Sequence, residues 1–178
     1  MPYNLRVVNY RRNKTGNPND HFFFSIVTEG KKPWFDNPEI NGLILEIVKA
    51  VEAKSGFKFS AWVILPDHLH WLTMAGTADY SKAIWAFKRG VSAQFKRTRT
   101  ISQGDILWQD RFWEHTIRDD DDYCRHVDYI HYNPVKHGYV RSPRDWQWSS
   151  FAEYVANGIY PEDWADGEDI VIDGMQYD

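Results

Sequence analysis

The sequence predicts an α+β fold of the ferredoxin-like or RRM-like type, with a split βαβ antiparallel sheet covered by helices on one face. Three observations lead to this prediction. Segments with strand or helix periodicity follow in the order strand, helix, strand, strand, helix, strand, helix. The connections between them are short. The length of 178 residues, 43% of them hydrophobic, suits one domain with its own core. The final helix is an addition to the ferredoxin-like order.

The first predicted strand and helix lie between residues 21 and 56. The run His21–Thr28 is rich in aromatic and β-branched residues and ends at a Glu-Gly turn, which favours a strand. Asn37 offers an N-cap with Pro38 at the first helical position, and Gly56 ends the helix. Apolar residues recur between them at helical spacing and indicate one buried face: Ile40, Leu43, Ile44, Ile47, Val48 and Val51.

A hairpin and a second helix are predicted next. The apolar stretches Phe57–Leu65 and His68–Met74 are joined by the turn pair Pro66-Asp67, which is typical of two antiparallel strands. A helix follows over Ser81–Arg97. Its apolar residues share one face, which we expect to pack on the sheet: Ile84, Phe87, Val91 and Phe95.

The last strand and helix follow a polar loop. Arg111–Ile117 is strand-like, and the acidic run Asp119–Asp122 suits a helix N-terminus, where the helix dipole favours negative charge. We expect Pro134 to end this helix. At 100° per residue, Tyr129 and Asn133 form an i, i+4 pair on a face that packing does not need, away from the apolar residues Tyr123, Val127 and Ile130.

Charge divides the chain into two parts. The formal net charge is −4, yet the region after Tyr154 holds seven acids and no Lys or Arg, so residues 1–154 carry +3. We therefore expect a domain over 1–154, with a basic arm over 1–20, and an acidic C-terminal tail over 155–178. The tail either covers part of the basic body or packs against the core through its aromatic residues.

Basic residues of the body indicate contacts with a DNA backbone. The arm contributes two arginines, and the second helix carries three cations one heptad apart on its outer stripe. The alternative for this stripe is an ordinary solvated face. The candidate DNA-binding residues are Arg11, Arg12, Lys82, Arg89, Lys96 and Arg111.

Two histidines form the strongest candidate for a metal site. His68 and His70 lie at i and i+2 on a predicted strand, so both side chains point to one face while Leu69 points to the other. The pattern is weak by itself, because a structural pair of partly buried histidines has the same spacing. Likewise Tyr129 alone is one of ten tyrosines, and Asn133 alone is an ordinary helix-stop residue before a proline.

Three stretches of the sequence carry a recognisable pattern: AWVILPDHLHWL (61–72), WQDRFWEHTIRD (108–119) and RHVDYIHYNPVKHGYV (125–140). The motifs YRR at 10–12 and DWQWSSF at 145–151 add to the pattern, which covers most of residues 1–155. Together they resemble the HUH single-tyrosine transposases, and most closely their REP-associated tyrosine transposase branch.

The resemblance implies an HUH nuclease fold with a C-terminal catalytic helix and a specific division of roles. Tyr129 is the implied nucleophile, and His68, His70 and Asn133 are the implied ligands of a divalent metal, Mg²⁺ or Mn²⁺. Cleavage of single-stranded DNA then leaves a 5′-phosphotyrosine and a free 3′-OH, so that the enzyme transfers strands. The implied targets are palindromic hairpin repeats of a bacterial chromosome.

Two other function classes remain open from the residues alone. RRM-type domains of the same topology bind single-stranded RNA without catalysis, although the RNP1-like pattern is absent here. A hydrolytic or structural-metal protein without a covalent intermediate would make Tyr129 incidental. With no apolar run long enough for a membrane and no secretory signal, we expect a cytoplasmic, nucleoid-associated protein. A monomer is expected because one chain can supply every site residue, and a dimer is the alternative.

Overall fold

The computed structural model describes residues 20–74, 79–98, 100–102, 104–167, 170, 172 and 175. The predicted arm, with Arg11 and Arg12, lies outside these residues apart from Asp20. Within the described ranges, the elements follow in the order β1 (His21–Val27), η2 (Glu29–Lys31), α1 (Pro38–Ser55), β2 (Lys58–Ile64), β3 (His68–Met74), α2 (Tyr80–Arg97), β4 (Trp113–Thr116), α3 (Asp120–Lys136), η3 (Pro143–Asp145) and α4 (Phe151–Ala156).

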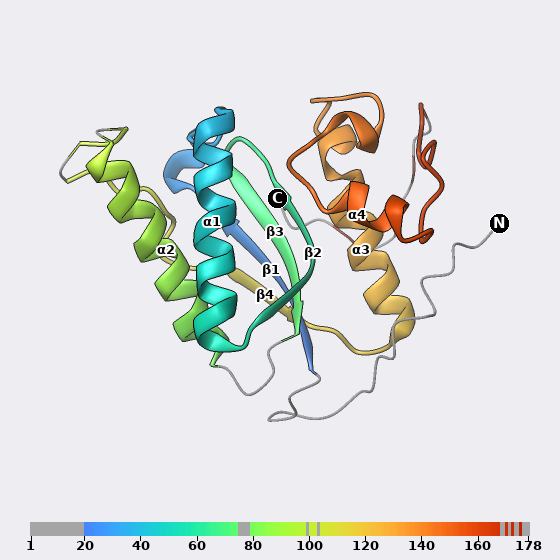
Figure 1. The fold of residues 1–178 in the computed structure, drawn as a ribbon, viewed down its shortest axis with the longest axis horizontal. Helices are drawn as coiled ribbons and strands as arrows, with labels where there is room; N and C mark the ends of the chain where they lie inside the picture. Colours follow the sequence, from blue (N-terminus) through green and yellow to red (C-terminus); the bar gives the residue numbers. More distant parts are fainter. Residues whose placement is uncertain are drawn as a thin grey trace.

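The strands form an antiparallel sheet in the order β2-β3-β1-β4. This is the strand order of a split βαβ fold, so the predicted fold class is confirmed. Figure 1 shows α1 and α2 side by side on one face of the sheet and α3 with α4 on the other. The sheet is therefore a central layer between two helical layers.

Residues of β3 alternate between these two layers. Leu69 and Trp71 join the core beneath α1 and α2, whereas Leu72 joins the core beneath α3. His68 and His70 lie on the same side as Leu72, because side chains alternate along a strand. The pattern of β3 therefore sends both histidines toward α3.

The first helix begins and ends at the capping residues expected from the sequence. The Asn37 side chain accepts a hydrogen bond from the Glu39 amide at 2.8 Å, and Gly56 ends α1 with φ +71°, a conformation that glycine adopts without strain. Asp79 caps α2 by accepting hydrogen bonds from the amides of Ser81 and Lys82. No helix within the described ranges is both long enough and apolar enough to cross a lipid bilayer.

Two expectations about α3 are wrong. Pro134 does not end this helix, which continues to Lys136 and is capped at His137. The cost is one missing N–H donor, while the His137 amide still bonds to the Asn133 carbonyl at 3.0 Å. Moreover, the face that carries Tyr129 and Asn133 is buried, because α3 lies against the second face of the sheet.

The segment after α3 packs on the same core. The boundary expected between residues 154 and 155 falls within α4. Beyond it, Tyr160 and Trp164 are buried and contact each other with ring centroids 4.5 Å apart, and Tyr160 also stacks on Phe151. Part of the predicted acidic tail thus contributes to the core around α3.

Candidate active site

Strand β3 places His68 and His70 side by side in the layer between the sheet and α3. Their ring centroids are 4.9 Å apart, and their residues are 4% and 0% exposed. The register pairs His70 with Ser25 of β1. Two imidazoles this close on one face are suited to a divalent cation.

Three successive turns of α3 face this histidine pair. The Tyr129 ring lies 5.2 Å from the His70 ring, and the His137 ring lies 5.1 Å from the His68 ring. Asn133 lies midway between Tyr129 and His137 at the i, i+4 spacing. The structure therefore brings His68, His70 and Tyr129 together, and Asn133 lies one turn after Tyr129 along α3.

The chemistry of Asn133 fits a metal ligand. It is fully buried, and neither side-chain polar atom has a hydrogen-bond partner among the described residues. Buried amides are normally hydrogen-bonded, because an unpaired one costs free energy. A cation between Asn133 and the histidines would satisfy its carbonyl oxygen. The donor set of two imidazoles and one amide oxygen suits Mn²⁺ or Mg²⁺.

Asp67 orients the first histidine. Its Oδ1 lies 2.6 Å from His68 Nδ1, so the imidazole donates this bond and presents Nε2 as the remaining ligand nitrogen. Burial alone would raise the pKa of Asp67, but the hydrogen bond and the charge of His68 lower it overall. Asp67 therefore remains a carboxylate acceptor at neutral pH.

Lys136 lies over Tyr129, the candidate nucleophile. Its Nζ donates a hydrogen bond to the phenolic oxygen of Tyr129 at 3.3 Å and lies 4.8 Å from the centroid of the same ring. Tyr129 is 2% exposed, whereas Lys136 is exposed. A positive charge therefore stands at the point where a phosphate would approach the phenol.

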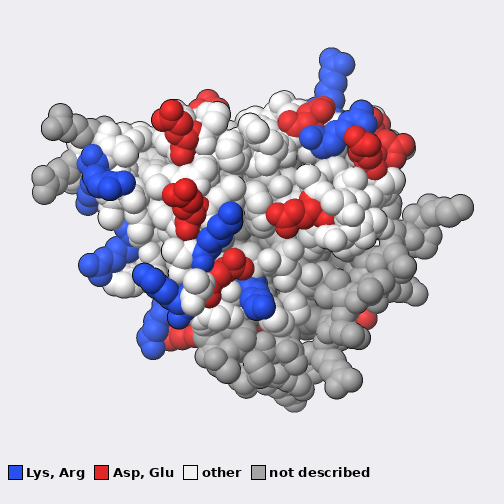
Figure 2. Space-filling view, viewed as in Figure 1, with Lys and Arg blue, Asp and Glu red and all other residues white. Residues whose placement is uncertain are grey.

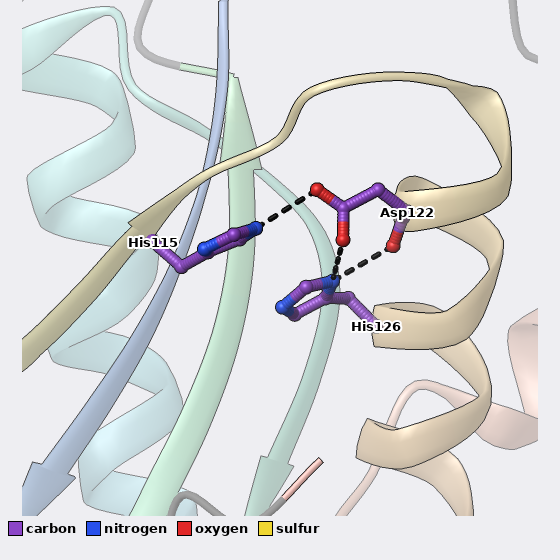
Figure 3. Close-up of side chains that lie close together, drawn as sticks. All are labelled: His115, Asp122 and His126. Carbon is purple, nitrogen blue, oxygen red and sulfur yellow. Dashed lines mark hydrogen bonds and ion pairs between the residues drawn. The ribbon is translucent and has the colours of Figure 1, made fainter. Parts of the chain in front are cut away.

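Sequence reasoning missed a second cluster, drawn in Figure 3, which joins β4 to the first turn of α3. His115 Nε2 donates to Asp122 Oδ2 at 2.8 Å, and His126 Nδ1 donates to the Asp122 carbonyl at 2.7 Å. Burial would raise the pKa of Asp122, but hydrogen bonds from His115 and the Arg118 amide bring it to about 2. Burial lowers the pKa of His126 to about 4.

The donor atoms of this cluster lie within 4.8 Å of one another, a spacing that a metal ion tolerates. The carboxylate of Asp122 is already engaged, however, since Arg118 and Arg125 also approach it. These two guanidinium groups oppose a cation at the same oxygens. The signal in the sequence is the alternation Trp113-Glu-His115 followed by Asp122 and His126 at i, i+4.

The predicted DNA-binding residues divide between the two faces of the sheet. Lys82, Arg89 and Lys96 lie on α2, on the face opposite α3. Figure 2 shows Lys and Arg side chains gathered along the α2 edge at the left, with both charge signs over α1. Arg111 is exposed just before β4 and lies outside that strand, which begins at Trp113 rather than at Arg111 as predicted.

Comparisons with known proteins find relatives that match most of this chain. Residues 19–133 match the family described as Transposase IS200 like. The chain is 39% identical over 146 residues to the REP-associated tyrosine transposase of Escherichia coli (strain K12), covering 81% of this chain and 84% of that protein. A relative from Haemophilus influenzae is 39% identical over 175 residues, covering 93% of this chain and 98% of that protein.

Solved structures of related proteins also resemble this chain. A REP-associated tyrosine transposase bound to a REP hairpin superposes with a TM-score of 0.71 at 34% identity, covering 91% of this chain and 94% of that one. A crystal structure from Deinococcus radiodurans R1 has a TM-score of 0.50 at 17% identity, covering 67% of this chain and 95% of that chain. At that identity the second likeness supports the fold alone.

Proposed function

Because the chain belongs to the REP-associated tyrosine transposase family, we propose that it is a metal-dependent endonuclease and strand transferase for single-stranded DNA. The family accounts for the cleavage and transfer of DNA strands. The assignment to residues rests on one observation, the contact between the Tyr129 and His70 rings at 5.2 Å. It joins a nucleophilic side chain on α3 to a pair of metal-ligating side chains on β3.

Tyr129 is the nucleophile in this proposal. Its phenolic oxygen attacks the scissile phosphorus, the P–O3′ bond breaks, and a 5′-phosphotyrosine and a free 3′-OH result. The phenolic proton passes to water, and the leaving oxygen takes a proton from water. A second 3′-OH reverses the step, so the protein transfers strands rather than only hydrolysing them.

His68, His70 and Asn133 would hold the divalent cation, Mg²⁺ or Mn²⁺. When bound, the cation supplies charge that polarises the scissile phosphate. Asp67 supports this arrangement by fixing the His68 ring through Nδ1.

Lys136 assists Tyr129 from the solvent side. A phenol with a pKa near 10 is mostly protonated at neutral pH, so attack needs positive charge near the forming phenolate. The hydrogen bond from Lys136 Nζ supplies such charge within 3.3 Å of the phenolic oxygen. The same ammonium group is exposed and can contact a non-bridging phosphate oxygen.

The proposed substrate is a palindromic hairpin of single-stranded DNA. A relative with 34% identity is known bound to a REP hairpin. Lys136, which contacts Tyr129, and the exposed Arg111 are candidates for contact with the DNA backbone. Lys82, Arg89 and Lys96 along α2, here called the α2 stripe, offer a second surface for a folded hairpin. The arginines of the arm, Arg11 and Arg12, are further candidates. One chain supplies the whole site, so we propose a monomer.

The direct test is the covalent intermediate. The full chain is incubated with a labelled REP-like hairpin carrying single-stranded flanks, with Mn²⁺ or with excess chelator, and resolved on a denaturing gel. The proposal expects a protein-DNA adduct that requires the metal. Hairpin binding without any adduct would instead identify a non-catalytic binding module, and cleavage without an adduct would identify a hydrolytic enzyme.

A further inference from the structure

The buried carboxylate of Asp122 holds two arginine side chains. Its Oδ2 accepts a hydrogen bond from Arg118 Nε at 3.3 Å, and its Oδ1 accepts one from Arg125 Nη2 at 3.4 Å. The Asp122 side chain is 2% exposed, whereas those of Arg118 and Arg125 are 64% and 41% exposed. Two guanidinium groups at the surface are therefore anchored to the same buried carboxylate.

Other contacts fix the position of Asp122. Its Oδ2 also accepts hydrogen bonds from His115 Nε2 at 2.8 Å and from the Arg118 amide at 3.0 Å, and its own amide donates to Asp119 Oδ1 at 2.8 Å. Figure 3 shows the His115 and His126 rings both directed at Asp122. A buried polar group with this many hydrogen bonds has little freedom to move. The two arginines are therefore held on a rigid support.

The local charge favours an anion. Burial raises the pKa of Asp122, but its hydrogen bonds lower the pKa to about 2, so one negative charge meets two positive ones at neutral pH. Each guanidinium contacts Asp122 through one nitrogen, and a guanidinium has five N–H donors. Among the described residues, neither arginine forms an ion pair with the exposed acids at 119–121. Both guanidinium groups therefore keep donors for a ligand.

Helical geometry places this pair beside the candidate nucleophile. Arg125 precedes Tyr129 by four residues, which is about one turn and about 6 Å along the axis of α3. At about 100° per residue, these two side chains leave the helix about 40° apart, and Lys136 leaves it between them. The centroid of the Phe23 ring lies 4.8 Å from that of His126 and 6.0 Å from that of Tyr129. One ring therefore separates the cluster around Asp122 from the nucleophile.

We propose that Arg118 and Arg125 form a clamp for one phosphate of the bound single strand, one or two nucleotides from the scissile phosphate, and that Asp122 is the positioning residue that orients both guanidinium groups. This inference rests on the proposed function. Arginine binds phosphate oxygens through paired N–H groups, and such charge-assisted bonds are stronger than neutral ones. Since Lys136 follows Tyr129 on the same face of α3, the nucleophile has a cation before it and a cation after it along the helix.

The experiment uses the full chain carrying Tyr129→Phe, so that no strand is cleaved, and a REP-like hairpin in which one phosphate at a time is an uncharged methylphosphonate. At one position in the single-stranded flank, this replacement should weaken binding on the order of 10- to 100-fold. Adding Arg125→Gln or Arg118→Gln should make the loss at that position smaller, because one of the two contacts is already gone. Replacing both arginines should remove it.

Asp122→Asn tests the positioning role. The variant keeps the shape of the side chain and removes the charge that anchors both arginines, so the methylphosphonate loss should shrink although both arginines are present. Arg125→Lys keeps the charge but not the planar fork and should retain part of the loss. Arg118→Gln and Arg125→Gln change exposed side chains, so the clamp is still tested if Asp122→Asn does not fold.

Arg144→Gln is the matched control. The Arg144 side chain is 43% exposed and pairs with Asp166 at 2.8 Å, in the segment after α3. Its removal should leave the methylphosphonate loss at the clamp position unchanged. Losses that stay the same at every position without Arg118 and Arg125 overturn the inference. So does an equal reduction at all positions, which is a general effect of charge.

The adduct assay with Tyr129 intact separates the clamp from the proposed function. If the adduct forms but no phosphate position depends on Arg118 or Arg125, only the clamp fails. If no adduct forms while one position depends on both arginines, the clamp is retained and the proposed catalysis fails.

Discussion

Lys136 Nζ lies 3.3 Å from the phenolic oxygen of Tyr129, one residue on the last turn of α3 and the other two turns earlier. The contact exists because α3 continues past Pro134. Had the helix ended at that proline, Lys136 would have left the helix surface before reaching the tyrosine. The same continuation brings the His137 ring to 5.1 Å from the His68 ring.

The charge of Lys136 is expected to set the rate of adduct formation. Lys136→Gln keeps a hydrogen-bond donor and removes the charge, so the single-turnover rate should fall on the order of 10- to 100-fold, as for loss of one charge-assisted hydrogen bond. Lys136→Arg should recover part of this loss. Lys54→Gln, at an exposed position on α1 across the sheet, is the control. An unchanged rate in Lys136→Gln would leave Lys136 without a catalytic role.

Asp67 is expected to affect the metal rather than the nucleophile. Asp67→Ala removes the acceptor for His68 Nδ1 and frees the ring to rotate, so Mn²⁺ affinity should fall about 10- to 100-fold. Asp67→Asn keeps a neutral acceptor, so its Mn²⁺ affinity should lie between those of Asp67→Ala and the wild type. Titration calorimetry with Mn²⁺ and no DNA measures the effect. Activity lost at saturating Mn²⁺ with unchanged affinity would assign Asp67 another role.

Much of the fold was predictable because local signals and burial agree. The caps Asn37 and Gly56, and the alternation along His68–Met74, each specify one element and one buried face. The pairing of His68 with His70 on one face follows from strand geometry alone. The roles proposed for Tyr129 and Asn133 came from the family resemblance, and the structure brings the Tyr129 ring to the His70 ring.

Other features depend on tertiary packing and were not predictable from local pattern. Helical spacing indicated one apolar face for α3, but this helix is covered both by the sheet and by the segment containing Tyr160 and Trp164. Burial of Tyr129 and Asn133 therefore needed knowledge of two separate contacts. The cluster around Asp122 depends equally on β4 and α3 meeting in space. A proline inside a helix has a local free-energy cost, and packing around α3 outweighs this cost at Pro134.

The pair formed by Asp128 and Tyr160 should make stability depend on pH. Burial raises the pKa of Asp128 to about 6, although the hydrogen bond donated by the Tyr160 hydroxyl at 2.6 Å works against this rise. The folded state then binds the proton more tightly than the unfolded state. Stability contributed by this group is present below about pH 4 and is lost as the pH rises to about 6, by roughly 3 kcal/mol.

Asp128→Asn isolates this contribution. The variant keeps the shape and never ionises, so its stability relative to wild type should improve by about 3 kcal/mol between pH 4 and pH 7.5. Urea unfolding at several pH values measures the difference. Burial lowers the pKa values of His126 and His131, so these groups change stability with pH in the opposite direction. The difference in unfolding free energy between the wild type and the variant at each pH cancels their effect. A difference that does not vary with pH would contradict the assignment.

The α2 stripe is expected to contribute affinity without contributing to the chemistry. Replacing Lys82, Arg89 and Lys96 by Gln should flatten the plot of log affinity against log salt by about one unit for each lost phosphate contact. The stripe lies across the sheet from Tyr129, so the single-turnover rate at saturating DNA should stay at the wild-type value. A salt slope that does not change would identify the stripe as a solvated face.

The last prediction separates the nucleophile from the metal ligands. Tyr129→Phe removes one oxygen and keeps the ring that contacts His70, so folding, Mn²⁺ binding and hairpin affinity should stay near wild type while the adduct disappears. His68→Ala and His70→Ala should abolish the adduct by a different route, the loss of Mn²⁺ binding.

Asn133→Ala should reduce Mn²⁺ binding and adduct formation less than His68→Ala or His70→Ala does, because a neutral amide is the weakest of the three ligands and water can replace it. Its removal also deletes a buried polar group without partners among the described residues, so thermal stability without metal should not fall as it does for a bonded amide.

An adduct that persists in Tyr129→Phe would place the nucleophile elsewhere. Tyr132 is then the first residue to test, although its hydroxyl accepts a hydrogen bond from the Ile170 amide at 3.2 Å on the side away from the sheet.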